Sequence, residues 1–349
     1  MMDVNGIDFD YFLGKAIGFF DSTMNGGKTR ALVKELDCAI RSGHNVMAYN
    51  SDKNSREQNS IVINGEHPFP ARTVRNIPEL RADLESKRHV NSTYTASPHM
   101  RGSPLLIDGM PQKRGYPLDV VGIDEANLFT LDPQGAQDLI DFLGWSRQNK
   151  IAVFMAGLTH DFRHHEFGYI NSVLKYTTNN IPQKAICMAL VDEQGSKCQR
   201  TAMHAQRVWS ADFAGKMGLE SYLKAEPHFN FVDKENRHYF NEYFPAPFFD
   251  KTVRIEEAQD GRIKYLPVCT DCARVPFRDE TYDLYNAIVR GDHTFGLLGQ
   301  PELTTAIVHF LQSENWIQEK SGVLVPVPFY RINIGSYAPS HELSPGDLK

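Results

Sequence analysis

The chain has 349 residues, of which 41% are hydrophobic and 23% are charged, and its formal net charge is −6. This composition is typical of a globular protein with a hydrophobic core, and the length allows about two domains. The acidic balance argues against a protein that coats DNA or RNA, because such proteins carry basic surfaces. No apolar run in the sequence is long enough to span a bilayer, and the first residues do not resemble a secretion signal, so we expect a cytoplasmic protein.

The first predicted elements are a strand over residues 16–20 and, after a glycine-containing loop, a helix. The helix is predicted because Leu32, Leu36 and Ile40 share one face, and Gly43 is placed to end it. The loop consists of Ser22, Thr23, Met24, Asn25, Gly26, Gly27, Lys28 and Thr29. A strand, such a loop and a helix that opens on Lys-Thr are typical of a polyphosphate site, in which backbone N–H groups bind the phosphate oxygens.

Two side chains of this loop fit the chemistry of bound Mg-ATP. Lys28 would contact the outer phosphates, and the hydroxyl of Thr29 would bind Mg²⁺. Ser22 stands where such loops usually begin with glycine, so a simple helix N-terminus is the alternative for the loop alone.

Further strands are predicted at residues 45–49, 120–123 and 151–158, and further helices at about 77–87, 134–148 and 302–313. The strands at 120–123 and 151–158 are apolar throughout, and a predicted helix separates them. Continuously apolar strands of this kind are typical of a parallel sheet that is covered on both faces. We therefore predict an α/β fold, with a parallel sheet and helices on both of its faces.

Two acidic residues, Asp124 and Glu125, directly follow the predicted strand at 120–123. The carboxyl ends of strands in an open α/β sheet are where ligands bind. Asp124 would help to place the Mg²⁺ held by Thr29, and Glu125 would accept the proton of an acceptor hydroxyl during phosphoryl transfer. For the pair alone, the alternative is two solvated carboxylates at a strand end.

Four of the five cysteines form a candidate zinc site. Cys269 and Cys272 have the spacing that lets two thiolates of one turn bind the same metal. Cys187 and Cys198 bracket a predicted hairpin that has Gly195 near its turn. We expect these thiolates to bind a structural Zn²⁺ without an open position for catalysis. For Cys269 and Cys272 alone, redox chemistry or chance pairing is the alternative.

Three histidines, His160, His164 and His165, follow the predicted strand at 151–158. No helix or strand spacing aims their rings at one point, which argues against a metal site. The intervening Asp161-Phe162-Arg163 favours a phosphate-binding or substrate-binding loop instead.

Three motifs occur in the order found in the thymidine kinase family of the cellular, zinc-containing type. Residues 22–29 resemble its G-P-M-F-S-G-K-[ST], residues 122–129 its I-D-E-x-Q-F-F, and residues 156–168 its A-G-L-D-x-D-F-R-x-x-P-F-G. Lys264 and Tyr265, just before Cys269, are similar to the family's lasso, the loop that closes over the nucleoside base. The resemblance covers residues 13–276 in patches, but neither residues 211–249 nor the C-terminal segment.

The resemblance implies ATP-dependent phosphorylation of the 5′-hydroxyl of a deoxynucleoside, thymidine above all, with Mg²⁺ and a structural Zn²⁺. It implies that Glu125 is the catalytic base and that Arg163 lies near the transferred phosphoryl group. The residues that it implies for nucleoside binding are Met24, Leu128, Leu158, Phe162, Phe167 and Tyr265. Relatives assemble as dimers and tetramers, so a homo-oligomer is expected, with neither nucleic acid nor membrane as a partner.

We predict a kinase domain over residues 10–185, a zinc-binding and lasso domain over 186–276 and a C-terminal extension over 277–349. An aromatic-rich insertion at about 208–250 interrupts the second domain. We expect it to pack against the kinase core or a neighbouring subunit, because exposed aromatic rings promote aggregation.

Several positions depart from the family pattern. Ala205 stands where a threonine often contacts the base, and residues 54–56 and 62–65 keep little of two family motifs. These departures leave a catalytically degenerate nucleotide-binding protein as the alternative function. A phosphate-loop ATPase that acts on nucleic acid is disfavoured, because the chain is acidic.

Overall fold

The computed structural model describes residues 16–54, 59–62, 68–93, 104–107, 110–113, 118–250, 261–292 and 300–328. Of the two stretches that depart from family motifs, residues 55–56 and 63–65 lie outside these ranges. None of the helices within the described ranges combines the length and the apolar character needed to cross a bilayer.

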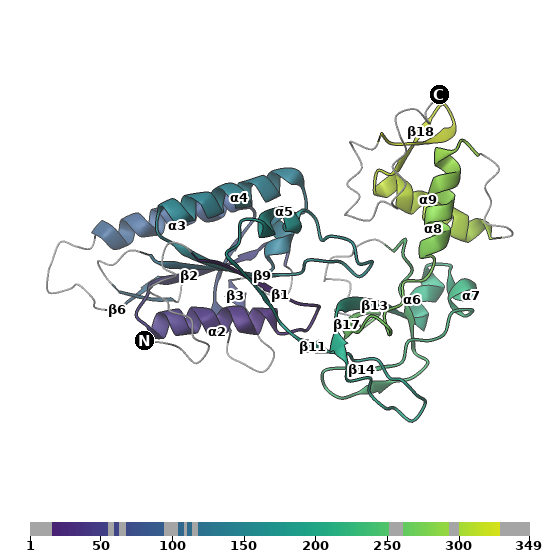
Figure 1. The fold of residues 1–349 in the computed structure, drawn as a ribbon, viewed down its shortest axis with the longest axis horizontal. Helices are drawn as coiled ribbons and strands as arrows, with labels where there is room; N and C mark the ends of the chain where they lie inside the picture. The colour runs from purple at the N-terminus through teal and green to yellow at the C-terminus, as the bar shows by residue number, and fades with distance from the viewer. Residues whose placement is uncertain are drawn as a thin grey trace.

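The N-terminal part is built on a six-stranded parallel sheet with helices on both faces (Figure 1). The strands are β1 (Ile17–Asp21), β2 (Val46–Ser51), β5 (Arg72–Val74), β8 (Val120–Ile123), β9 (Ala152–Gly157) and β10 (Asn179–Pro182). Their order across the sheet is β10-β1-β9-β8-β2-β5, and each neighbouring pair is parallel. The predicted α/β fold class is therefore confirmed.

Helix α2 lies on one face of this sheet, and α3, α4 and α5 lie on the other (Figure 1). The bounds are α2 (Lys28–Arg41), α3 (Ile77–Thr93), α4 (Pro133–Gln148) and α5 (Ile170–Leu174). Two short hairpins, β3 (Ser60–Ile61) with β4 (Phe69–Pro70) and β6 (Pro104–Ile107) with β7 (Met110–Lys113), complete this part.

The alternation of side chains along β1 fills both faces of the sheet. Phe20 packs in a cluster with Leu32 and Leu36 of α2, whereas Ile17 and Phe19 belong to the cluster under α3 and α4. Successive side chains of a strand point to opposite faces, so a strand that is apolar throughout must be covered on both. Helices therefore cover both faces of the sheet, as its apolar strands predict.

A smaller antiparallel sheet follows, in the order β16-β13-β17. The elements from residue 185 to residue 268 are β11 (Ala185–Ile186), β12 (Thr201–Ala202), β13 (His204–Ser210), α6 (Ala211–Lys216), α7 (Glu220–Leu223), β14 (Phe231–Val232), β15 (His238–Tyr239), β16 (Tyr243–Pro245) and β17 (Ile263–Val268). In Figure 1 this sheet lies beyond the end of the parallel sheet at which β1 and β9 finish.

The C-terminal elements are α8 (Arg278–Val289), α9 (Pro301–Ser313), β18 (Ile317–Lys320) and β19 (Val323–Pro326). They share a hydrophobic core with the aromatic-rich insertion, and we call it the second core. It contains Trp209, Phe248, Phe310 and Trp316, and it also takes in Phe162 from the loop after β9. The insertion therefore packs against the C-terminal extension, a partner that the sequence-based expectation did not include.

Candidate active site

The loop between β1 and α2, which we call the phosphate loop (residues 22–29), has the tight backbone that a phosphate cradle requires. Asn25 and Gly27 have positive φ angles of 60° and 83°. A Cβ atom on Gly26 would lie 1.6 Å from Oγ of Ser22, so only glycine fits at position 26. The Ser22 hydroxyl donates to the carbonyl of Gln183 at 3.0 Å. Serine in place of the usual first glycine is thus accommodated by a hydrogen bond to the chain after β10.

Thr29 and Asp124 meet at the N-terminus of α2. The Thr29 hydroxyl donates to Oδ1 of Asp124 at 3.1 Å. Burial, and then the charge of Glu125, raise the pKa of Asp124 to about 7, while Lys28 and the Thr29 hydroxyl act in the opposite direction. A hydroxyl and a buried carboxylate are the oxygen ligands that Mg²⁺ prefers, and its charge would offset the cost of that burial. These two residues fit the predicted magnesium site.

Glu125 has an unusual backbone and two neighbours of different character. Its φ angle is 48°, in the left-handed region that costs energy for a residue other than glycine. Its Oε1 lies 3.4 Å from Nζ of Lys28, and both side chains are buried. The left-handed turn starts the short 3₁₀-helix η3 (Ala126–Phe129) and directs Glu125 back to the phosphate loop.

Glu125 also lines an apolar cavity of about 100 Å³, which we call the acceptor cavity. The six side chains that the family resemblance implies for nucleoside binding all line it: Met24, Leu128, Leu158, Phe162, Phe167 and Tyr265. One carboxylate therefore contacts both the phosphate-loop lysine and a cavity of apolar and aromatic side chains.

Further residues line the acceptor cavity. Ala205 and Asp161 come from segments that the sequence analysis placed near the substrate, whereas Lys53, Asn127, Leu131 and His160 were not assigned to the nucleoside site. Asn127 fixes the end of β9, because its Oδ1 accepts the N–H of Leu158 at 2.9 Å. A Cβ on Gly157 would lie 2.8 Å from the same oxygen, which explains the glycine there. Asp161 could have been found, because it belongs to the D-F-R motif.

The phosphate loop touches the smaller sheet directly. The side-chain amide of Asn25 donates to the carbonyl of Tyr265 at 3.2 Å. Tyr265 lies on β17, opposite Arg207 on β13. The wall of the acceptor cavity that comes from the lasso-like segment is thereby joined to the loop that would hold the phosphates.

A second, more polar cavity of about 530 Å³ adjoins the acceptor cavity at His160, Asp161 and Ala205. On its wall the rings of His164 and His204 stack, with centroids 3.8 Å apart. Burial, and then the neighbouring His204, lower the pKa of His164 to about 4. At neutral pH this ring is therefore uncharged, and the cavity gains no positive charge from it.

The third histidine of the cluster has a different partner. Nε2 of His165 lies 3.3 Å from the hydroxyl of Tyr282 on α8. Burial, and then the charge of Arg163, lower the pKa of His165 to about 4. His165 thus belongs to the contact between the loop after β9 and the C-terminal extension.

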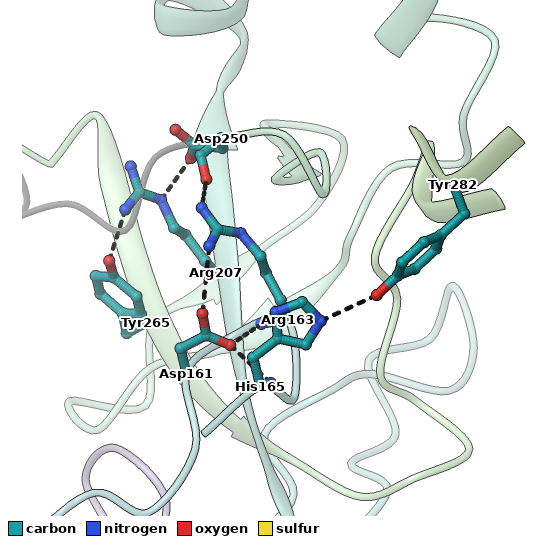
Figure 2. Close-up of polar contacts among 7 residues, drawn as sticks. All are labelled: Asp161, Arg163, His165, Arg207, Asp250, Tyr265 and Tyr282. Carbon is teal, nitrogen blue, oxygen red and sulfur yellow. Dashed lines mark hydrogen bonds and ion pairs between the residues drawn. The ribbon is translucent and has the colours of Figure 1, made fainter. Parts of the chain in front are cut away.

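Arg163, which the family resemblance implies to lie near the transferred phosphoryl group, is enclosed by protein contacts. Its guanidinium is buried and donates to Asp161 and Asp250 (Figure 2). It also lies 4.8 Å from the ring centre of Phe310. Arg163 is not among the described side chains that line either cavity. The physical reason is the second core, whose aromatic rings and the carbonyl of Asp250 surround the guanidinium.

The four cysteines predicted to bind zinc come together. Their sulfur atoms all lie within 4.8 Å of one another. The ten-residue spacing between Cys187 and Cys198 is bridged by a hairpin, in which Gly195 has a φ of 86° and Val191 donates to the carbonyl of Ser196. Burial opposes ionisation of Cys198, but hydrogen bonds, first that from Arg200, lower its pKa to about 6. The cluster fits a tetrahedral zinc ion that four thiolates would hold.

Comparison with known proteins points in the same direction. A protein-family model described as thymidine kinase matches residues 89–224, which include Glu125, the loop after β9 and the first two clustered cysteines. No curated protein matches the chain. The cytoplasmic domain of the Thermomonospora curvata Type VII secretion ATPase EccC is similar in structure with a TM-score of 0.31 and 8% identity, and the match covers 68% of this chain but 24% of that one. That likeness is too low to carry an argument.

The family implies ATP and nucleoside binding and a phosphotransferase activity. Over residues 89–224, the family match confirms the resemblance to the thymidine kinase family that the sequence motifs indicated.

Proposed function

We propose that the protein transfers the γ-phosphoryl group of ATP to the 5′-hydroxyl of a deoxynucleoside, with thymidine as the first candidate. The observation that carries this proposal is the position of Glu125. Its carboxylate is 3.4 Å from the Lys28 ammonium and also lines the acceptor cavity. A hydroxyl bound in that cavity beside Glu125 would face phosphates held at Lys28.

Each part of the site then has one task. The backbone N–H groups of the phosphate loop and the Lys28 ammonium bind the phosphates, and Thr29 and Asp124 hold Mg²⁺. The ion supplies positive charge against the charge that develops on the phosphoryl oxygens. Glu125 accepts the proton of the 5′-hydroxyl as the oxygen attacks, and the apolar cavity holds the nucleoside. In this proposal Arg163 supports the acceptor cavity from outside and does not contact the phosphoryl group.

The choice of thymidine rests on the family resemblance and on the apolar and aromatic lining of the acceptor cavity. Ala205 offers no hydroxyl to the base, and a site discriminates among substrates through a few polar contacts and the fit of its walls. Asn127 stays occupied with the N–H of Leu158. The choice among nucleosides therefore depends mainly on how the base fits the walls of the cavity.

The test is transfer of labelled phosphate from ATP to a panel of purine and pyrimidine deoxynucleosides, with Mg²⁺ and zinc present. Phosphorylation of thymidine is the expected result. Glu125→Gln should lower kcat by about 10²–10⁴-fold while ATP still binds, because general base catalysis contributes about that much. The matched control is Glu85→Gln, which changes an exposed ion pair on α3 and should leave kcat unaltered. Transfer to none of the nucleosides would refute the proposal.

A second candidate function is nucleotide binding without turnover, and the buried position of Arg163 favours it. A kinase in which Arg163 stays enclosed by Asp161, Asp250 and the second core would have one positive charge fewer near the reacting group. ATP binding in the absence of transfer to every nucleoside of the panel would identify this case.

The proposal extends to assembly and location. We expect a cytoplasmic homo-oligomer, a dimer or a tetramer, as the family implies. We also propose that the domain boundaries lie at residues 185 and 276. Size-exclusion chromatography with light scattering on the full chain measures the assembly.

A further inference from the structure

A buried ionic network joins the insertion to the acceptor cavity, and Asp250 lies at its centre (Figure 2). Asp250 ends the described part of the insertion and is 8% exposed. Its Oδ2 accepts a hydrogen bond from Nε1 of Trp209 at 2.7 Å and forms an ion pair with Nε of Arg207 at 2.6 Å. Its backbone carbonyl accepts a hydrogen bond from Arg163. One residue therefore fixes two buried arginines.

The first arm of the network runs through Arg207 to Tyr265. Arg207 is fully buried, and its Nη1 donates to the Tyr265 hydroxyl at 2.7 Å. Its guanidinium also lies 5.5 Å from the ring centres of Phe162 and Tyr265. A planar guanidinium can bridge an acid and a hydroxyl at fixed angles, which a lysine ammonium cannot do. Arg207 thereby holds a side chain of the acceptor cavity in place.

The second arm runs through Arg163 to Asp161. Nη1 of Arg163 lies 3.5 Å from Oδ2 of Asp161, a carboxylate that lines both cavities. The other oxygen of Asp161 accepts the N–H groups of Arg163 and His165 at 2.8 and 3.0 Å, so it also sets the turn after Phe162. Two arginines and two aspartates balance their charges, as buried ions must. Both arms end on residues of the acceptor cavity.

We propose that Asp250 is a positioning residue for the acceptor cavity, which acts through Arg207 on Tyr265 and through Arg163 on the loop that carries Asp161 and Phe162. The inference deepens the proposed function and rests on it, since it assigns to the insertion the task of shaping the nucleoside site. It concerns acceptor binding alone. The phosphate loop has its own contacts, among them Thr29 with Asp124 and Lys28 with Glu125.

The test compares Asp250→Asn, Tyr265→Phe and the double variant in the full-length protein. Asp250→Asn removes the charge that opposes Arg207 and should raise the KM for the nucleoside about tenfold, with kcat and the KM for ATP changed less than about twofold. Tyr265→Phe removes the hydroxyl that Arg207 holds and should have a similar effect. The double variant should be no worse than the stronger single variant, because both changes break the same arm.

The matched control is Asp233→Asn in the same part of the chain. Asp233 is also buried, and its Oδ2 accepts from Nε of Arg237 at 2.7 Å and from the Tyr239 hydroxyl at 3.1 Å. This variant breaks an acid–arginine–tyrosine cluster whose arginine is exposed and which does not line the acceptor cavity, so the KM for the nucleoside should stay at the wild-type value. If Asp250→Asn does not fold, Arg207→Lys takes its place, because a lysine keeps the ion pair with Asp250 but cannot also reach Tyr265.

Equal increases of both KM values in Asp250→Asn, additive effects in the double variant, or the same nucleoside defect in Asp233→Asn would each overturn the inference. A measurement that does not depend on catalysis tests the positioning role of Asp250 separately from the proposed kinase function. With 3-fluorotyrosine incorporated, the ¹⁹F resonance of Tyr265, identified by its loss in Tyr265→Phe, should shift in Asp250→Asn and not in Asp233→Asn. A wild-type protein that phosphorylates no nucleoside refutes the function alone, whereas an unshifted Tyr265 resonance refutes the positioning role alone.

Discussion

The two ends of the candidate site are built in different ways. At the phosphate end, Asp124 and Glu125 directly follow β8, and Lys28 and Thr29 open α2 after the loop that follows β1, so each is placed by a few neighbouring residues. The acceptor end takes its walls from the loop after β9, from β13 and from β17, and buried charges hold these segments together. Phosphate chemistry therefore depends on local sequence, whereas the nucleoside site depends on how distant segments pack.

The largest expected effect follows from removing the zinc ion. Chelation, or Cys269→Ser, should unfold the region around the cysteine cluster and abolish nucleoside phosphorylation, because a structural zinc contributes folding energy directly. ATP should still bind to the phosphate loop with little change, since the partners of Lys28 and Thr29 follow a strand of the parallel sheet, although the loop loses the hydrogen bond from Asn25 to Tyr265. Metal analysis should find about one zinc ion per chain in the wild type. Loss of ATP binding together with acceptor turnover would show that the two ends are not built independently.

A change confined to the phosphate end should leave the acceptor end intact. Lys28→Ala should lower kcat about 10³-fold, because it removes a positive charge aimed at the developing charge of the phosphoryl group. Nucleoside binding, measured by calorimetry, should persist. Lys34→Ala, on the exposed face of the same helix, is the control and should keep full activity. A fully active Lys28→Ala variant would contradict the assignment of the phosphate loop.

The acceptor end should be the more sensitive to acid. The pKa of His165 is lowered to about 4 in the folded protein, against 6.5 for an unperturbed histidine. The unfolded chain therefore binds a proton first as the pH falls, and stability is lost from about pH 6.5 down to about pH 4. The difference corresponds to about 3 kcal/mol. Urea unfolding monitored through tryptophan fluorescence should show this loss of unfolding free energy, and His165→Gln should lose less. If the free energy of unfolding falls equally with pH in both proteins, His165 is not the cause of the acid sensitivity.

The smallest expected effect lies within the phosphate loop. Gly26→Ala places a Cβ atom against Oγ of Ser22 and should raise the KM for ATP about tenfold, as overpacking of a tight turn costs about 1–3 kcal/mol. Adding Ser22→Gly to this variant removes the close contact and should recover most of the loss. A steady-state titration with ATP decides the matter, and a double variant as impaired as Gly26→Ala would mean that Ser22 is not the cause.

The four central strands of the parallel sheet were predictable because their signals are local, but the edge strands β5 and β10 were not predicted. The apolar runs 120–123 and 151–158 contain strands β8 and β9, and the acid pair follows β8 as expected. The second core was not predictable in the same way. It joins Phe162, Trp209 and Phe310, which are far apart in the chain and do not form one periodic pattern.

The position of Arg163 shows the same limit at a single residue. Its motif gives its place in the loop after β9, but its partner Asp250 lies 87 residues further along, in an insertion that the family resemblance does not cover. The direction of a long side chain depends on which acceptor and which rings surround it. Helix α8 was also missed, although its buried Leu284, Ala287 and Ile288 have the spacing of one helical face.

Phe162 has a consequence for how this chain can be shortened. Its ring forms part of the acceptor cavity and is also a member of the second core. A protein trimmed to the length of its family motifs would expose the inner side of that ring to water, and the substrate wall would lose its backing. Removal of the C-terminal extension is therefore expected to require a compensating change at position 162.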